Sequence, residues 1–241
     1  MPKTQIRALS IMDEDLIEVI EFLSNKGIIN TMSEAQKRTA KKIHSATYSL
    51  ILWRFQIRNL PDNSQVFLDE IASDALQILP QALMGYRKTT VLLIRSVIEN
   101  VLRHIYFSDH IVEFQLANKQ KKWYLSISDN FSYVKSHPIY SDTEIKYDSI
   151  NKLQTLYDDL SSDVHGRSVS HLEMRKSLSC IKFDQEIFDL QMNLIKRCSE
   201  CSNFLLLMFH KQRVAKLESE QKGIFLKSIP PIARRIWMGI E

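Results

Sequence analysis

The chain has 241 residues, of which 44% are hydrophobic and 25% are charged, a composition that is typical of folded proteins and excludes a largely disordered chain. It contains only five glycines and six prolines. Folds rich in β-strands need many turns that use these two residues, so their shortage favours long helices. The net charge of +4 permits a polyanionic partner but is weaker than that of a dedicated nucleic-acid-binding domain.

Apolar residues that recur at every third and fourth position predict about six helices. We expect them at about residues 13–27, 33–60, 64–78, 81–107, 148–162 and 184–216. The third should end before Pro80, because the residue that precedes a proline is disfavoured in the helical conformation. Residues 108–148 are predicted to form a less regular insertion, and residues 224–241 an amphipathic tail. The sequence therefore predicts an all-α protein in which a helical bundle forms a single domain over residues 1–241.

The second half of the helix expected at 81–107 has two different faces. Apolar residues line one of them, and the opposite face carries Arg95, Glu99, Asn100 and Arg103. Arg95, Glu99 and Arg103 follow one another at intervals of four residues. As an exposed ladder they would contribute only about 0.3–0.5 kcal/mol per pair. Facing a histidine of another helix, they would form a phosphate-binding groove; a buried structural ion pair is a third interpretation.

The stretch YDDLSSDVHGRS at 157–168 follows a helix-like pattern and is rich in carboxylates. Carboxylates are unfavourable at the C-terminal end of a helix, so stability alone does not explain them. Gly166 permits a sharp turn that leaves His165 and Arg167 at a corner. An imidazole and a guanidinium together suit acid–base chemistry on a phosphodiester. Alternatively, His165 bonds to a nearby carboxylate and only stabilises the turn.

The cysteines Cys180, Cys198 and Cys201 cannot all pair within one chain. No N-terminal apolar segment with a cleavage site is present, and the longest apolar run, 204–209, is far shorter than the about 20 residues that a membrane-spanning helix needs. We therefore expect a cytoplasmic protein. Cys198 and Cys201 alone supply two ligands, which favours core packing over a metal site. We expect no metal and no cofactor.

Three strings, RSVIENVLRHIYF at 95–107, DH at 109–110 and YDDLSSDVHG at 157–166, resemble the helical HEPN superfamily in its bacterial abortive-infection branches. The resemblance covers about residues 82–175 and implies a HEPN-like core at about 64–216. It further implies a compact bundle that often dimerises. Many such proteins are metal-independent endoribonucleases of toxin–antitoxin and antiviral systems.

The catalytic mark of this family is an arginine followed, after four to six intervening residues, by a histidine. His165 takes the place of the histidine, but Asp158, Asp159 and Leu160 stand where the arginine is expected. Arg103 and His110 have a permitted spacing, although chance alone predicts about one such pair in this composition. The candidate catalytic residues are His165, Arg103, Arg95, Glu99, Arg167 and His110.

Two basic stretches are candidates for binding nucleic acid. KQKKWY at 119–124 combines lysines that would hold a phosphate backbone with aromatic rings that would stack on bases, and the helix at 33–60 begins with a basic segment. The candidate residues are Lys119, Lys121, Lys122, Trp123, Arg38 and Lys41. Solvated surface residues are the alternative interpretation. Convergence of the two stretches in space would favour RNA binding.

The resemblance implies a component of a bacterial antiviral defence or toxin–antitoxin system. In one hypothesis the chain is an endoribonuclease that acts on RNA phosphodiesters. In the second it is a non-catalytic module that docks to a partner protein or nucleic acid, with its arginines paired to acidic residues. A helical scaffold without a role in defence is a third. For the first two we expect a homodimer and a protein partner of the defence system.

Overall fold

The computed structural model describes residues 3–57, 60–121, 125–165, 177 and 180–240. These residues form twelve α-helices and no strand, which confirms the all-α prediction. The helices are α1 (Lys3–Asn25), α2 (Glu34–Gln56), α3 (Asp62–Leu83), α4 (Arg87–Asp109), α5 (Ile111–Gln120), α6 (Ile127–Ser136), α7 (Pro138–Tyr147), α8 (Ser149–His165), α9 (Gln185–Phe209), α10 (Lys211–Ala215), α11 (Ser219–Lys227) and α12 (Pro231–Met238).

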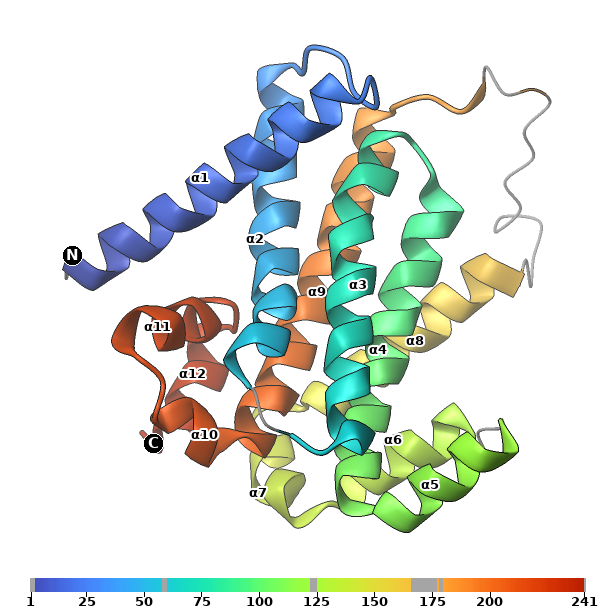
Figure 1. The fold of residues 1–241 in the computed structure, drawn as a ribbon, viewed down its shortest axis with the longest axis vertical. Coiled ribbons are helices and arrows are strands. Elements are labelled where there is room, and N and C mark those ends of the chain that lie inside the picture. The colour runs from blue at the N-terminus through green and yellow to red at the C-terminus, as the bar shows by residue number, and fades with distance from the viewer. Residues whose placement is uncertain (1–2, 58–59, 122–124, 166–176, 178–179, 241) are drawn as a thin grey trace.

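Four long helices, α2, α3, α4 and α9, pack side by side and form the centre of the molecule (Figure 1). Helix α8 packs against α4 and α9, while α1 lies outside the bundle and contacts α2 and α11. Helices α5, α6 and α7 lie at one end of the bundle, next to the C-terminal part of α4. The candidate residues that the structure describes therefore lie on the central bundle, on helices packed against it or at the ends of those helices.

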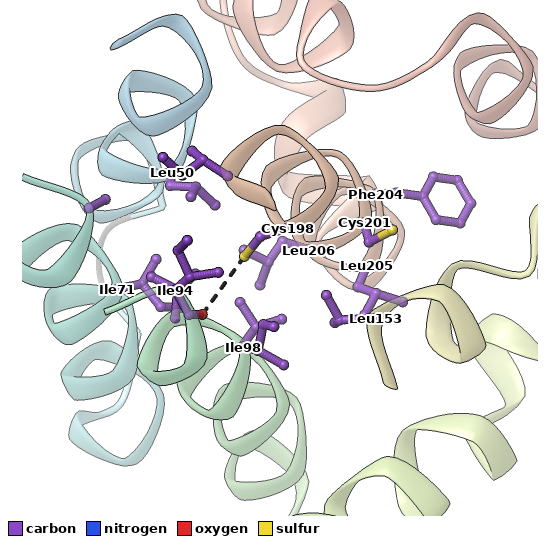
Figure 2. Close-up of a cluster of buried hydrophobic side chains, with 14 of the residues drawn as sticks. Leu50, Ile71, Ile94, Ile98, Leu153, Cys198, Cys201, Phe204, Leu205 and Leu206 are labelled. Carbon is purple, nitrogen blue, oxygen red and sulfur yellow. Dashed lines mark hydrogen bonds between the residues drawn. The ribbon is translucent and has the colours of Figure 1, made fainter. Parts of the chain in front are cut away.

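The core forms where the apolar faces of these helices meet around α9. Figure 2 shows side chains from five helices in contact there, labelled Leu50, Ile71, Ile94, Ile98, Leu153, Cys198, Cys201, Phe204, Leu205 and Leu206. Residues 201–208 of α9 are buried without interruption, as expected of a helix surrounded by others. Cys198 and Cys201 belong to this core, and burial raises the pKa of the Cys198 thiol to about 12.

A buried polar network joins α2 to α9. The side-chain oxygen of Asn203 accepts a hydrogen bond from the indole N–H of Trp53 (2.7 Å). Its amide nitrogen donates to the hydroxyls of Ser49 (2.8 Å) and Ser199 (2.9 Å). Ser199 in turn donates to the backbone carbonyl of Ala46 (2.9 Å). Because Asn203 uses both ends of its amide, the network defines one register of α9 against α2.

Several helix boundaries differ from the predicted ones: α1 begins at Lys3, not at 13, and the largest change in the core is at Pro80. Pro80 lies inside α3, which continues to Leu83, because the last turn buries Ala82 and Leu83 in the core and this packing outweighs the local cost of the proline. The next helix then begins at Arg87, not at 81. A turn at Gly85 separates the two: its φ is +78°, and a Cβ there would lie 2.3 Å from the carbonyl oxygen of Lys182.

The number of helices also exceeds the predicted six. Residues 108–148 hold three helices of ten residues each, α5, α6 and α7, and not a less regular insertion. Their short apolar faces give a weak periodic signal, although the capping box of Ser126 and Asp129 marks the start of α6. The helix predicted at 184–216 is interrupted at His210, after which α10 begins. The predicted tail holds parts of α11 and α12.

Replacement of Asn203 by alanine tests the polar network. The variant leaves the buried indole N–H of Trp53 without its partner, so we expect the free energy of unfolding to fall by about 1–3 kcal/mol. Urea denaturation followed by circular dichroism measures the change. Asn193→Ala, at an exposed position of the same helix, should change stability by no more than about 0.5 kcal/mol. Equal effects of the two substitutions would contradict the proposed role of Asn203.

Candidate functional site

Arg95 of α4 and His165 of α8 lie next to each other, although 70 residues separate them in the chain. The Nη1 atom of Arg95 is 3.3 Å from Nε2 of His165. Its Nη2 atom donates to the hydroxyl of Tyr157, also on α8, at 2.7 Å, and the guanidinium carbon lies 4.8 Å from the centre of that ring. The contact between α4 and α8 thus brings the predicted ladder and the predicted histidine together.

Glu99 lies at the centre of this cluster. It accepts hydrogen bonds from Arg103 (2.9 Å) and Tyr157 (2.9 Å), and Arg95 is at 3.4 Å. The charged side chains of the ladder are 18–23% exposed, so solvent screens their attraction less than it would for fully exposed pairs. The ladder is therefore half-buried and paired. The two guanidiniums leave one positive charge after pairing with the carboxylate.

Tyr157 links the ladder to α8. Its hydroxyl accepts from Arg95 and donates to Glu99 at the same time. Burial raises the pKa of Tyr157, and the hydrogen bond from Arg95 opposes this increase. The hydroxyl therefore stays protonated near neutral pH and holds Arg95 in place. In the sequence, Tyr157 continues the apolar stripe of its helix and gives no sign of a polar role. Only the fold shows that its phenol faces the polar stripe of α4.

His165 is the last residue of α8 and is exposed. The predicted helix ended at Ser162, so His165 occupies the final helical turn and not a loop. A guanidinium can only donate, so Nε2 of His165 accepts the bond from Arg95. The neighbouring Asp163 instead binds Arg87 of α4 (2.9 Å). Gly166 and Arg167 lie outside the described residues.

His110 lies away from this cluster. Its Nδ1 donates to the backbone carbonyl of Tyr106 (2.8 Å), and its ring stacks on Tyr106 with the ring centres 4.1 Å apart. Arg103 instead binds Glu99 and the side-chain oxygen of Asn100. Since α4 continues to Asp109, seven helical residues place His110 about 10 Å further along the axis than Arg103. The structure therefore gives the two no common site.

The two basic stretches do not converge. Lys119 and Lys121 lie at the end of α5, which packs against α3 and α4 at the end of the bundle opposite the start of α2 (Figure 1). Arg38 and Lys41 lie in the first half of α2, where Lys41 binds Asp13 of α1 at 2.6 Å. Lys122 and Trp123 fall outside the described part of the chain. Among the residues that the structure describes, the two stretches therefore form no combined surface, and the condition that would have favoured RNA binding through both is not met.

Asp74 of α3 lies next to polar residues of α4, Ser96 and Asn100. It was not among the candidates predicted from the sequence. It is 6% exposed, and its Oδ2 has no hydrogen-bond partner within the described residues. Ser96 and Asn100 of α4 favour its charged form. Burial is the main cause that raises the pKa of Asp74 to about 6. A signal was present: Asp74 falls on the face of its helix that also carries the buried Phe67 and Ile71.

A second histidine cluster lies inside the bundle. Nδ1 of His104 donates to the backbone carbonyl of Ser64 (2.9 Å), and its Nε2 lies 2.7 Å from Nε2 of His210. Burial lowers the pKa of His104 to about 4, and burial together with His104 lowers that of His210. Both rings are therefore neutral near pH 7. The pair has no exposed face and joins α4 to the end of α9, so we assign it a structural role.

No protein family, curated protein or solved structure matches the chain. Among the described residues, no group of three or more histidine, cysteine, aspartate or glutamate side chains could hold a metal ion. In the same part of the chain, no helix combines the length and the apolar character needed to cross a bilayer. The geometry around Arg95 and His165 is thus the main evidence for a functional site.

The buried histidine pair predicts a dependence of stability on pH. Because folding lowers both pKa values, the unfolded chain binds more protons than the folded protein between about pH 6.5 and pH 4. Stability is therefore complete above pH 6.5 and falls as the pH decreases. Each histidine contributes up to about 1.4 kcal/mol per pH unit. His210→Gln keeps a hydrogen-bond donor towards His104 and should reduce this slope.

Urea denaturation at several pH values between 4 and 7 measures that slope. Lys211→Gln, an exposed substitution next to His210, serves as the control, because lysine does not titrate in this range. Its slope should match that of the wild type. If His210→Gln shows the wild-type slope as well, His210 is not buried as a neutral ring.

Proposed function

We propose that this protein is a metal-independent endoribonuclease that acts on RNA phosphodiesters, with Arg95 and His165 at its catalytic site, and that it serves in a bacterial antiviral defence or toxin–antitoxin system. The supporting observation is the 3.3 Å contact between an exposed imidazole and a guanidinium from a different helix. The resemblance of three strings to the HEPN superfamily supports the defence context, a homodimer and a protein partner of the same system.

The chemistry follows from the nature of RNA. Its 2′-hydroxyl attacks the adjacent phosphorus, the 2′-oxygen–phosphorus bond forms and the bond to the 5′-oxygen breaks. His165 accepts the proton of the 2′-hydroxyl, and the leaving 5′-oxygen takes a proton from water. Arg95 binds the phosphate oxygens and stabilises their growing negative charge. The products are a 2′,3′-cyclic phosphate and a 5′-hydroxyl.

The contacts of Arg95 define what must move. Nη1 is bonded to His165, whereas Nη2 is held by Tyr157 and Glu99. A phosphate oxygen that replaces His165 at Nη1 would free the imidazole for proton transfer while Nη2 stays anchored. Tyr157 and Glu99 then act as positioning residues, because they orient the guanidinium without touching the reacting atoms.

The second candidate function is a non-catalytic binding module. One observation favours it: Glu99 binds Arg103 and lies 3.4 Å from Arg95, so the ladder is partly neutralised by its own helix. In this alternative the cluster joins α4 to α8, and the single excess positive charge contributes to docking. The two functions differ in whether His165 is required for cleavage of RNA.

Cleavage of a labelled single-stranded RNA in the presence of EDTA tests the proposal. The wild type should give fragments ending in a 2′,3′-cyclic phosphate and should leave DNA of the same sequence intact, since DNA lacks the 2′-hydroxyl. His165→Ala and Arg95→Ala should each lower the cleavage rate by at least about 100-fold. Arg95→Lys keeps the charge but not the two-pronged geometry and should also be impaired.

Arg87→Ala is the matched control, because Arg87 also reaches the end of α8 but binds Asp163 and not His165. It should keep most of the activity. Circular dichroism identifies any variant that fails to fold. A wild type that binds RNA without cleaving it would support the binding module, and undiminished cleavage by folded His165→Ala would exclude this site.

A further inference from the structure

An open groove between α2 and α9 collects basic side chains from three helices. It encloses about 690 Å³ and ends at the last residue of α11 and the serine that follows. Its cationic lining residues are Arg38, Lys41, Lys42, Lys196 and Lys227. Glu200 is the acidic residue that the groove contains. The sequence pointed to Arg38 and Lys41, while Lys196 and Lys227 join them only through the packing of α9 and α11.

The charge balance of the chain shows how strongly this groove is charged. It holds five of the 32 lysines and arginines and one of the 28 acidic residues. The remaining 27 basic and 27 acidic residues cancel. The lining thus has a formal net charge of +4, as large as that of the whole chain with the histidines neutral. A chain that is only mildly basic as a whole thus presents a concentrated positive site.

Internal ion pairs offset only part of this charge. Lys41 binds Asp13 at 2.6 Å, and Lys196 lies 3.8 Å from Glu200. Burial raises the pKa of Glu200, and Lys196 opposes that increase. Lys42 is exposed and makes no ion pair within the described residues. At least part of the positive charge therefore faces solvent.

The other lining residues indicate what kind of anion fits. Ser45, Ser199 and Ser228 line the groove beside the cations. The hydroxyls of Ser199 and Ser228 donate to the backbone carbonyls of Ala46 and Phe225, so the lysines and the exposed Ser45 are the donors left for phosphate oxygens. None of the lining residues is aromatic, so the groove offers no ring on which a base could stack. Recognition of a phosphate backbone, independent of base sequence, suits this lining.

The groove is separate from the cluster around Arg95. Ser199 of α9 faces α2 and donates to the carbonyl of Ala46, whereas the adjacent Cys198 faces α4, with its sulfur 4.0 Å from the carbonyl of Ile94 (Figure 2). Ser199, which lines the groove, and Cys198, which contacts the residue before Arg95, thus point to different sides of α9. Charge reversal in the groove should leave the Arg95 cluster intact.

We propose that the groove between α2 and α9 binds the phosphate backbone of single-stranded RNA as a second contact, away from Arg95 and His165. RNA as the polyanion rests on the proposed function, whereas the anion site rests on the groove itself. Binding here raises the affinity for RNA of any sequence and takes no part in the chemical step.

The test measures binding of a fluorescent single-stranded RNA by anisotropy at several salt concentrations, with all proteins carrying His165→Ala so that cleavage cannot interfere. Lys42→Glu combined with Lys196→Glu should weaken binding by at least about 10-fold. Each lost phosphate contact lowers the slope of log affinity against log salt by about 0.7, so the double variant should lose about 1.4. Lys211→Glu combined with Lys216→Glu, both exposed on or beside α10, makes the same change in net charge and should bind like the parent.

Equal weakening by the two double variants would mean that only net charge matters and would overturn the groove. Loss of binding in Lys119→Glu combined with Lys121→Glu, but not in the groove variant, would move the contact to α5. Absence of RNA binding, or displacement of RNA by polyglutamate as effective as by unlabelled RNA, would also overturn the proposal. Cleavage by proteins with an intact His165 is measured separately, so failure of the groove and failure of the nuclease are distinguishable.

Discussion

The structure depends on the way α9 is held inside the bundle. Asn203 is fully buried and is bonded to Trp53, Ser49 and Ser199, so a shift of α9 along α2 would leave several polar groups without partners in an apolar surrounding. This constraint sets the position of α9, and the other helices pack against the faces that remain. The groove lies along the α2–α9 contact, and the Arg95 cluster lies where α4 meets α8.

One face of α9 packs against α4 and α8, the two helices that carry the candidate catalytic cluster. Cys198 and its neighbours pack against α4, and α8 packs against both helices. This arrangement presents the polar stripe of α4 to the polar end of α8, where Arg95 meets Tyr157 and His165. The other face places Lys196 opposite the basic start of α2. A single buried network therefore supports both the candidate catalytic cluster and the proposed anion-binding groove.

The polar groups of this bundle differ in how they are stabilised. His104 and His210 are stable inside the bundle as neutral rings, because an uncharged imidazole can both donate and accept a hydrogen bond. Asp74 keeps one oxygen without a partner among the described residues, and burial raises its pKa. Arg95 and Glu99 instead form an ion pair at the rim of the bundle and share the hydroxyl of Tyr157 as a hydrogen-bond partner. A pair at the rim retains contact with solvent, as the proposed exchange of His165 for a phosphate at Arg95 requires.

The amino-acid sequence by itself determined the helical class, the position of the long helices and the buried face of α4, because all three follow from local spacing of apolar residues. It also pointed to Arg95 and His165 as candidates for acid–base chemistry on a phosphodiester. Only the tertiary structure decided that they touch, that His110 stacks on Tyr106 instead, and that Pro80 stays within α3. These outcomes depend on packing between helices distant in the sequence, where core burial outweighs local preference and where charges such as Lys41 and Lys196 meet only after α2 and α9 are aligned.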